Sequence, residues 1–287
     1  MKRKFICLIM VLTLAFADFS ANANALTGDI NVFVDKVAEI AIPKLAKVSG
    51  LEPTTDGTVN SAIDLLDKDG IDYGVVLPIA TKPTQQQTIN NWAKDIYKNK
   101  IISFGTVHPM AEDVLDEIDR IKEMGLKGLK LHNDYQKVFI FDEVNLKVYK
   151  RLEELGLPVV FHMGYDPVSP KVHRAMPYDL LWLHEKFPKL KIIGAHMGGV
   201  NAWESVYFYL AGVDNIYFDT AFVGGRIPED LYAKIIKKHG ADKILFGSDL
   251  PWSSPSAEKK IIEKLPLSSE DIDKIFYKNA VDLLKLF

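Results

Sequence analysis

The regular alternation of short apolar runs with helical stretches constrains the fold of this chain most strongly. After residue 26, runs rich in β-branched residues are separated by stretches whose apolar residues are spaced three and four apart. Strands separated by helices in this way are typical of a parallel sheet with right-handed crossovers. We therefore predict strands at residues 73–80, 101–107, 126–132, 158–164, 191–198, 215–221 and 243–249.

A further strand is a candidate at the front of the chain, in the segment TGDINVF at residues 27–33. Eight βα units over about 260 residues match the size of a (β/α)8 TIM barrel. The alternative is a doubly wound open sheet, but no Gly-x-Gly-x-x-Gly follows the first strand, which disfavours its dinucleotide-binding form. We predict the α/β class and a (β/α)8 TIM barrel, with allowance for a degenerate first strand.

The N-terminal residues differ from the rest of the chain. A basic start, MKRK, precedes the apolar run FICLIMVLTLAFA, and SANANA then offers cleavage sites after Ala23 and Ala25. This is the three-part form of a secretory signal, and its apolar run is too short for an ordinary spanning helix. We predict a signal peptide at residues 1–25, a single domain at 26–287, and export to the periplasm or beyond. An uncleaved anchor or a misassigned start, with a cytoplasmic protein, is the alternative.

The charge balance favours a small-molecule partner. The formal net charge is −3 and the pI is about 6.2, and no basic block or stripe interrupts the sequence. Nucleic acid and an anionic membrane surface are therefore disfavoured as partners. We expect no stable membrane span after processing, and we leave homo-oligomerisation open.

Titratable residues gather at the ends of the predicted strands. In a TIM barrel, side chains at the C-terminal strand ends converge on one mouth, where active sites lie. Of the seven histidines, four lie at the ends of predicted strands, and these ends also carry a lysine and two aspartates. The residues are His108, Lys130, His132, His162, His196, Asp219 and Asp249. We interpret the other three, His173, His184 and His239, as surface or helix-end imidazoles.

His162, His196 and Asp249 together predict a metal site. Neutral imidazole and carboxylate are ligands of divalent metals, and such a set leaves positions open for an activated water. A non-ligating imidazole beside the metal can shuttle a proton. The period-two alternation of a strand places Lys130 and His132 on one face. Lys130 then either holds a substrate carboxylate or pairs with a neighbouring aspartate.

Three of these segments resemble a known family. VVFHMGYD, KIIGAHMGG and KILFGSDLPW, in this order and spacing, are similar to motifs of the amidohydrolase-related metal-dependent hydrolases. That branch includes decarboxylases similar to aminocarboxymuconate-semialdehyde decarboxylase. LLDKDGIDYGVVLP and the terminal IFYKNAVDLLKLF also match, so the resemblance covers roughly residues 33–287.

The resemblance implies roles for individual residues. It makes His162 a metal ligand, His196 a second-site ligand or proton shuttle, and Asp249 a ligand that also orients the attacking water. The family's first strand carries His-x-His, whereas the matching positions before FVDK are Asp29 and Asn31. We therefore expect Asp29 to supply an oxygen ligand for one weakly held ion, Zn²⁺ or Mn²⁺.

The leading functional hypothesis is a metal-dependent hydrolase of the amidohydrolase type, acting on a small anionic carbonyl compound through a metal-bound water. The alternatives are a non-oxidative decarboxylase of the same superfamily, a pseudoenzyme that binds without turnover, and a lyase that forms a Schiff base on Lys130. We predict that Lys130, His132 and Arg174 bind the substrate. Arg226 is a further candidate, with a solvent-exposed surface charge as its alternative role.

Overall fold

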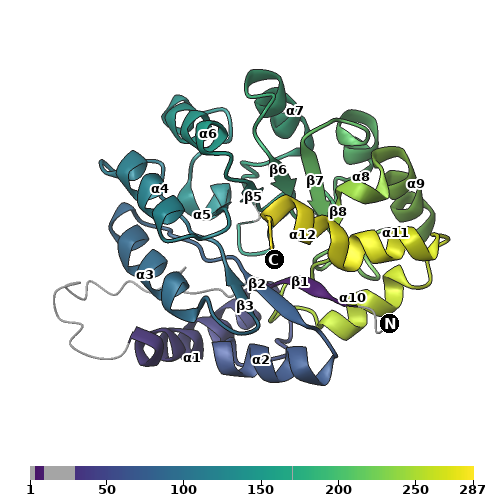
Figure 1. Ribbon diagram of the computed structural model, residues 1–287, viewed down its shortest axis with the longest axis horizontal. Coiled ribbons are helices and arrows are strands. Elements are labelled where there is room, and N and C mark those ends of the chain that lie inside the picture. The colour runs from purple at the N-terminus through teal and green to yellow at the C-terminus, as the bar shows by residue number, and fades with distance from the viewer. Residues whose placement is uncertain (1–3, 10–29, 170) are drawn as a thin grey trace.

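The computed structural model describes residues 4–9, 30–169 and 171–287. Its strands form a parallel barrel inside a ring of helices (Figure 1), which confirms the predicted TIM-barrel fold. All seven strands predicted after residue 26 are present, each shorter than the apolar run that contains it. The strands are β1 (Ile6–Ile9), β2 (Tyr73–Val76), β3 (Ile101–Ser103), β4 (Leu129–Leu131), β5 (Val159–Phe161), β6 (Ile192–Gly194), β7 (Ile216–Asp219) and β8 (Ile244–Leu245).

Helices and turns connect successive strands. In chain order they are α1 (Ile30–Ser49), α2 (Val59–Lys68), η2 (Pro83–Gln85), α3 (Gln86–Ile96), α4 (Val114–Glu123), α5 (Asn133–Gln136), α6 (Glu143–Leu155), α7 (Pro177–Lys186), α8 (Trp203–Ser205), η3 (Val206–Leu210), α9 (Glu229–His239), η4 (Ala241–Lys243), α10 (Pro255–Ile262), α11 (Ser269–Asp273), η5 (Lys274–Lys278) and α12 (Asn279–Leu284).

Two runs of hydrogen-bonded strands, β1-β2-β3 and β4 to β8, are joined into a closed ring. Between β3 and β4 the join is a bridge from Gly105 to Leu129. Between β8 and β1, the Leu8 N–H donates to the Phe246 carbonyl at 2.8 Å, and the Ser248 N–H donates to the Leu8 carbonyl at 3.0 Å. Closure satisfies the strand edges that an open sheet would leave exposed.

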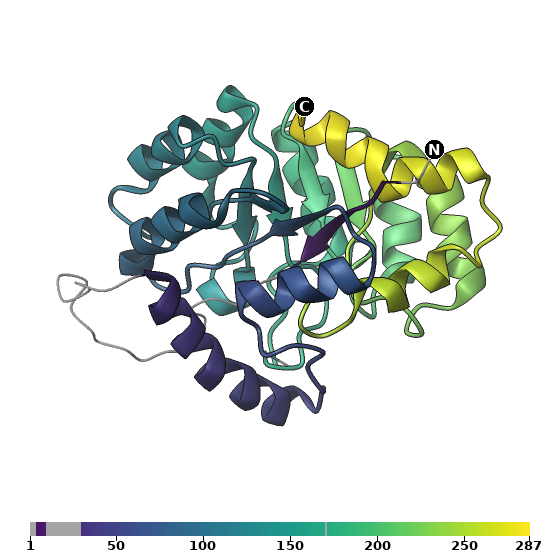
Figure 2. The ribbon, with the colours of Figure 1, turned by 60° about the horizontal axis from the view of Figure 1, so that its bottom comes forward.

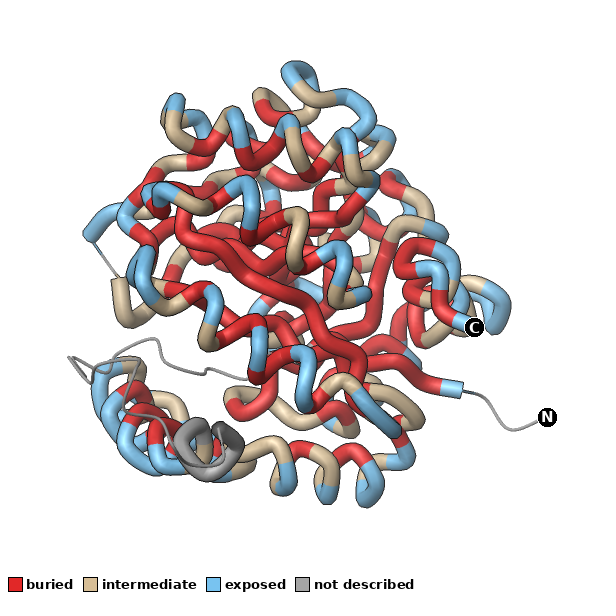
Figure 3. Tube along the Cα trace, turned by 60° about the vertical axis from the view of Figure 1, so that its left-hand side comes forward, coloured by how far each residue is buried: buried red, intermediate tan, exposed pale blue. Residues whose placement is uncertain are grey.

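Side chains alternate between the inside of the barrel and the layer under the helices. Leu8 packs in the interior cluster, whereas Cys7 packs in the outer cluster against the helices. Leu129 and Leu131 also belong to the outer cluster, so Lys130 between them faces the interior. Figure 3 shows the buried strands at the centre of the molecule and exposed segments mainly on the surrounding helices.

The two ends of the barrel are covered differently. Residues of α12, among them Leu283 and Leu284, join the interior cluster together with Tyr73 at the start of β2, so α12 closes the N-terminal end. Helix α1 lies at the opposite end of the molecule (Figure 2). Its residues Leu45 and Ser49 line the cavity at the C-terminal end. The functional side chains therefore lie between the barrel mouth and α1.

The predicted first strand is wrong, because residues 30–33 begin helix α1 and Ile6–Ile9 form the first strand. The buried residues Val37, Ala41 and Leu45 of α1 are four residues apart, as on one face of a helix. In contrast, Ile6, Cys7 and Leu8 are all buried within the barrel wall. Residues 27–29, including Asp29, lie outside the described residues.

The predicted export remains a prediction. The position of β1 means that cleavage of the N-terminal segment would alter the fold. Cleavage after Ala23 or Ala25 would remove β1 and reopen the barrel between β2 and β8. Retention of β1 and removal of the N-terminal segment are therefore mutually exclusive for this fold. Among the described residues, no helix is both long and apolar enough to cross a membrane.

We expect Leu8→Ala to lower the free energy of unfolding by roughly 2–5 kcal/mol, because it leaves a cavity in a packed interior. Leu8 is only 2% exposed. Denaturant unfolding measures the effect, with Lys4→Ala at an exposed position as the control. A chain that begins at Leu26 should lose its cooperative transition altogether. An unchanged transition in both the Leu8→Ala variant and the truncated chain would show that β1 is not part of the folded protein.

His239 ends α9 and has a structural role there. Its side chain is 2% exposed, and its ring stacks on Phe218 with centroids 4.1 Å apart. The Gly212 N–H donates to Nδ1 at 3.1 Å, so Nε2 carries the proton and donates to the Ile216 carbonyl at 3.0 Å. Burial lowers the pKa of His239 to about 4, and the nearby charge of Lys243 acts in the same direction.

This lowered pKa predicts a loss of stability in acid. Between pH 6.5 and about 4 the unfolded chain binds a proton at His239 that the folded chain does not, so stability falls as the pH drops through this window. The free energy of unfolding should fall by roughly 3 kcal/mol across this window because of His239. His239→Gln keeps a donor and an acceptor but does not titrate. Thermal melts from pH 7 to 4 should therefore show a shallower pH dependence for this variant, and identical slopes would contradict the assignment.

Candidate metal centre and cavity

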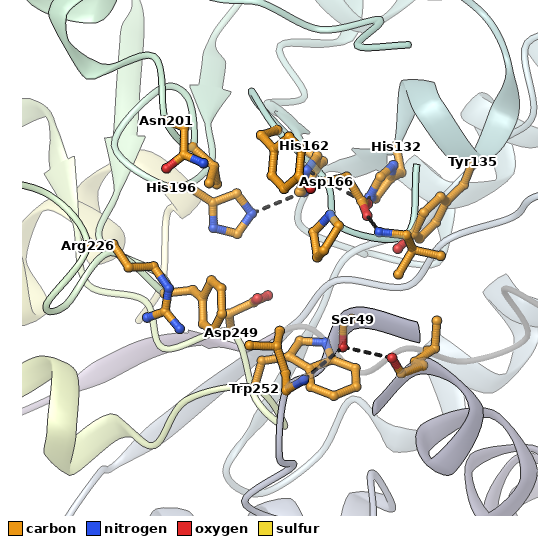
Figure 4. A pocket seen from close by; sticks show the side chains of 17 residues that line it. Ser49, His132, Tyr135, His162, Asp166, His196, Asn201, Arg226, Asp249 and Trp252 are labelled. Atoms are coloured by element: carbon orange, nitrogen blue, oxygen red, sulfur yellow. Dashed lines mark hydrogen bonds and ion pairs between the residues drawn. The ribbon is translucent and has the colours of Figure 1, made fainter. Parts of the chain in front are cut away.

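The C-terminal end of the barrel contains a cavity of about 310 Å³. Figure 4 shows side chains from several strand ends pointing into it. Its walls come from α1, from the loops after β4 to β8, and from the segment that follows α1. The lining residues are Leu45, Ser49, Leu51, His132, Tyr135, His162, Tyr165, Asp166, Pro167, Val168, His196, Val200, Asn201, Phe222, Arg226, Asp249 and Trp252.

The backbone turn after β6 is held by Asp219 at the end of β7. The Asp219 carboxylate accepts the backbone N–H of His196 at 2.8 Å and that of Ala221 at 3.1 Å. His196 itself has φ of 59°, in the left-handed region that non-glycine residues seldom adopt. Asp219 therefore fixes both loops, and with them the direction of the His196 ring.

The protonation of His196 and His162 follows from one carbonyl. His196 Nδ1 lies 2.8 Å from the Ala221 carbonyl oxygen, which can only accept, so Nδ1 carries the proton. His196 Nε2 is then an acceptor, and His162 Nδ1 donates to it at 3.1 Å. This leaves His162 Nε2 with a free lone pair, and among the described residues this buried atom has no hydrogen-bond partner.

Asp166 is a preorganised carboxylate beside this lone pair. It accepts from His132 Nε2 at 3.2 Å and from the Val168 N–H at 2.6 Å, and it interacts with the Tyr135 hydroxyl. Burial alone would raise the pKa of Asp166, but the hydrogen bond and charge of His132, together with the Val168 N–H, lower it below its ordinary value. Asp166 Oδ2 lies 4.0 Å from His162 Nε2.

Three rings form a stack along this wall of the cavity. The His132 ring lies between Tyr135 and His162, with centroid distances of 3.6 and 4.1 Å and interplanar angles of 4° and 10°. Burial lowers the pKa of His162 well below its ordinary value, and the neighbouring His132 and His196 act in the same direction. His162 is therefore a neutral imidazole, the form that binds metal.

His132, His162 and Asp166 fit a divalent metal ion. Ligand atoms of the three buried residues lie within 4.8 Å of one another. Two imidazoles and a carboxylate suit Mn²⁺ or Zn²⁺ and leave further positions open. A ligating histidine normally donates its other N–H to an acceptor, and His162 does so to His196. To bind a metal through Nε2, His132 would have to give up its hydrogen bond to Asp166, and its Nδ1 has no partner among the described residues. We therefore expect His132 to be the weakest of the three ligands.

A second group of charges lies deeper in the barrel. Lys130, Asp219 and Asp249 line a small inner cavity together with His196. Burial lowers the pKa of Lys130 and raises that of Asp249, while the opposite charges oppose both shifts. Asp249 also lines the main cavity, whereas Lys130 does not. Of the two roles considered for Lys130, this placement favours charge pairing with the aspartates.

A family model named amidohydrolase matches residues 53–286. This protein belongs to the amidohydrolase family. The match begins after β1 and α1, so it includes β2 to β8 and all of the side chains of the metal cluster.

Solved structures show the same fold over the whole amidohydrolase chain. 5-Carboxyvanillate decarboxylase from Sphingomonas paucimobilis has a TM-score of 0.72 and 17% identity, with 100% of both chains covered. 2,6-Dihydroxybenzoate decarboxylase from Rhizobium has a TM-score of 0.69 and 16% identity, with 99% of each chain covered. Dihydroxybenzoic acid decarboxylase from Polaromonas sp. JS666, solved with manganese and 2-nitroresorcinol, has a TM-score of 0.68 and 18% identity, with 99% of this chain and 98% of that chain covered.

The structure brings together only part of the predicted site of this amidohydrolase. Of the predicted ligands, His162 belongs to the metal cluster, Asp249 lies in the same cavity outside the cluster, and Asp29 lies outside the described residues. His196 accepts a hydrogen bond from His162. His132, which was predicted to bind substrate, belongs to the cluster. His108 is buried but does not line the cavity.

The two predicted arginines lie in different surroundings. Arg174 is not among the cavity-lining residues: its backbone N–H donates to Asp134 at 2.7 Å, and its guanidinium lies 3.7 Å from that carboxylate. Arg226 lines the cavity, and its guanidinium lies 3.5 Å from the centre of the Phe222 ring. Arg226 therefore fits the predicted contact with an anionic substrate better than Arg174.

Several cavity residues were not predicted from the sequence. Asp166 follows His162 by four residues, and the Asp-Pro pair there is a turn signal, but its approach to His132 on the neighbouring strand is not visible locally. Trp252 is the last residue of the KILFGSDLPW motif but was given no role, and Tyr135 carried no signal beyond its proximity to His132. Leu45 and Ser49 belong to α1, a helix where a strand was expected.

We expect His162→Ala and Asp166→Asn each to weaken Mn²⁺ binding by at least about tenfold, because each removes a ligand. Asp249→Asn should leave the affinity unchanged, since Asp249 lies outside the cluster. Calorimetric titration of chelator-treated protein with Mn²⁺ measures this. The opposite pattern, with loss at Asp249 and none at Asp166, would return the site to the ligand set implied by the sequence.

Proposed function

We propose that this protein is a metal-dependent decarboxylase of an aromatic carboxylic acid. One observation carries the proposal: the metal-competent cluster of His132, His162 and Asp166 forms one wall of a cavity that is otherwise rich in aromatic rings. These rings belong to Tyr135, Tyr165, Phe222 and Trp252. A cavity of about 310 Å³ is in the size range of small-molecule sites. It suits a single-ring substrate.

The chain's own residues supply binding and proton delivery. A bound divalent ion would supply charge stabilisation for an anionic oxygen of the substrate. The aromatic side chains hold the ring and exclude water. Asp249, a buried carboxyl that lines the cavity apart from the cluster, is placed to give a proton to the ring carbon. The carbon–carboxylate bond then breaks, its electron pair stays on that carbon, the new C–H bond forms, and carbon dioxide leaves.

His196 is a positioning residue in this scheme. Its Nδ1–H is used by the Ala221 carbonyl and its Nε2 accepts from His162, so in the neutral form it has no further proton to deliver. It instead keeps the His162 Nε2 lone pair directed at the cluster. This departs from the proton-shuttle alternative that the resemblance implies for His196.

Hydrolysis, the leading hypothesis from the sequence, receives less support. A hydrolase of this type needs a carboxylate beside the metal to orient the attacking water. The carboxylate in the cluster, Asp166, already accepts hydrogen bonds from His132 and the Val168 N–H. Asp249, the group expected for this role, lies with Lys130 and Asp219 rather than in the cluster. The three compared structures are of enzymes named as decarboxylases, and this supports the same choice.

A pseudoenzyme remains the second candidate, because β1 provides no metal ligand. Its residues within Ile6–Ile9 are apolar apart from Cys7, which packs in the outer layer under the helices. The cluster on β4 and β5 is the counterargument. Turnover decides between the two.

The experiment incubates Mn²⁺-loaded protein with 2,6-dihydroxybenzoate, 5-carboxyvanillate and related aromatic acids in D₂O. We expect release of carbon dioxide and deuterium at the carbon that lost it. Asp249→Asn should lower kcat by about 100-fold or more without weakening Mn²⁺ binding, while Asp64→Asn on exposed α2 serves as the matched control. Water-derived ¹⁸O in the product without carbon dioxide would favour hydrolysis. Binding of acids with neither product would favour the pseudoenzyme.

A further inference from the structure

Tyr135 lies beside the metal cluster and contacts two of its members. It belongs to the short helix α5, which begins directly after His132. Its ring stacks on the His132 ring, with centroids 3.6 Å apart and an interplanar angle of 4°, and its hydroxyl hydrogen-bonds to the Asp166 carboxylate. Figure 4 shows Tyr135 next to His132 at the edge of the cavity. One side chain therefore touches both an imidazole and a carboxylate of the cluster.

The hydrogen bonds to Asp166 show why the Tyr135 hydroxyl is important. Asp166 Oδ1 accepts the Val168 N–H at 2.6 Å and the Ser169 N–H at 3.3 Å, and Oδ2 lies 3.2 Å from His132 Nε2. A carboxylate has about four acceptor positions, so these three donors and the Tyr135 hydroxyl occupy all of them. Metal binding at Asp166 therefore requires one of the four donors to leave.

His132 is the donor that can leave most easily. Its ring can carry the proton on Nδ1 instead and then present a lone pair on Nε2, whereas the Val168 and Ser169 N–H groups are always donors. The Tyr135 hydroxyl is protonated at neutral pH and stays a donor as well. Once His132 has left, Tyr135 is the only side chain of the four donors that still orients the Asp166 carboxylate.

The position of Tyr135 is set by the anchoring of α5. The Gln136 side-chain amide donates to the Ala80 carbonyl at 2.9 Å and to the Val107 carbonyl at 2.7 Å. These hydrogen bonds join α5 to the segments that follow β2 and β3. The Tyr135 ring also packs against a small apolar cluster that includes Leu45 of α1. The ring and the hydroxyl are thus held in place by contacts outside the metal cluster.

We infer that Tyr135 is a positioning residue for the metal cluster: its hydroxyl orients the Asp166 carboxylate, and its ring holds the plane of the His132 imidazole. The inference rests on the proposed function, in which this cluster holds the divalent ion. Hydrogen-bond partners of metal ligands typically change metal affinity by about 10- to 100-fold when they are removed. Tyr135 should therefore affect metal affinity although it is not itself one of the three ligands.

Calorimetric titration of chelator-treated protein with Mn²⁺ tests the hydroxyl and the ring separately. Tyr135→Phe removes the hydroxyl and keeps the stacked ring, and we expect it to weaken Mn²⁺ binding by about tenfold. Tyr135→Leu removes both and should weaken binding further. Tyr165→Phe is the matched control, because Tyr165 also lines the cavity, and it should leave the affinity unchanged. A merely structural role of Tyr135 would lower the melting temperature of the metal-free protein without changing the Mn²⁺ affinity.

A double-mutant cycle tests whether Tyr135 acts through Asp166. In the Asp166→Asn background, Tyr135→Phe should weaken Mn²⁺ binding by no more than about twofold, because the carboxylate that it orients is already absent. An unchanged affinity of the single Tyr135→Phe variant, or its full effect in the Asp166→Asn background, would overturn the inference. The expected Tyr135 effect without carbon dioxide release from any acid would refute the proposed function alone. Carbon dioxide release by a protein whose Mn²⁺ affinity does not depend on Tyr135 would refute this inference alone.

Discussion

Closure of the barrel between β1 and β8 is the constraint on which the rest of the structure depends. The join consists of short parallel strands, and it links Leu8 to Gly247, residues at opposite ends of the chain. Because parallel strands have no local turn between them, the contact is made only when the intervening βα units are in place. Strand-end side chains converge on one cavity only in the closed ring. The metal cluster and its cavity therefore depend on a strand that contributes no ligand to them.

The strands that follow helices could be predicted because each has its own boundary signals. Apolar runs such as those of β5 and β6 are short, and glycine or proline lies close to their ends. The first strand lacks such boundaries. Phe5 to Ile9 lie within a longer apolar run that fits a secretory signal equally well, and their position is set by the gap between β2 and β8. That gap is a property of the assembled barrel, so local pattern could not reveal it.

The candidate site likewise has residues that could be predicted from the sequence and residues that could not. His132, His162 and His196 were predicted because they lie at the ends of predicted strands, and strand ends have a fixed place in this fold. Asp166 lies in a loop, where a turn closed by the Val168 and Ser169 N–H groups aims its carboxylate at His132. The candidate metal ligands therefore lie just beyond the ends of β4 and β5 rather than around β1. The site can therefore offer three candidate ligands although β1 has none of the expected histidines.

The arrangement of the side chains at the C-terminal end of the barrel depends on strained backbone conformations and on the Ala221 carbonyl. His196, Phe222 and Asp249 follow β6, β7 and β8, and all three have positive φ values, of 59°, 59° and 68°. Each such conformation costs on the order of 1–3 kcal/mol and persists only where its surroundings enforce it. At His196 the enforcing contacts are the Asp219 carboxylate and the Ala221 carbonyl, and the latter also fixes the protons of His196 and His162. Through the hydrogen bond from His162 Nδ1 to His196 Nε2, this geometry leaves His162 Nε2 unprotonated on the side of Asp166, and among the described residues that nitrogen has no hydrogen-bond partner.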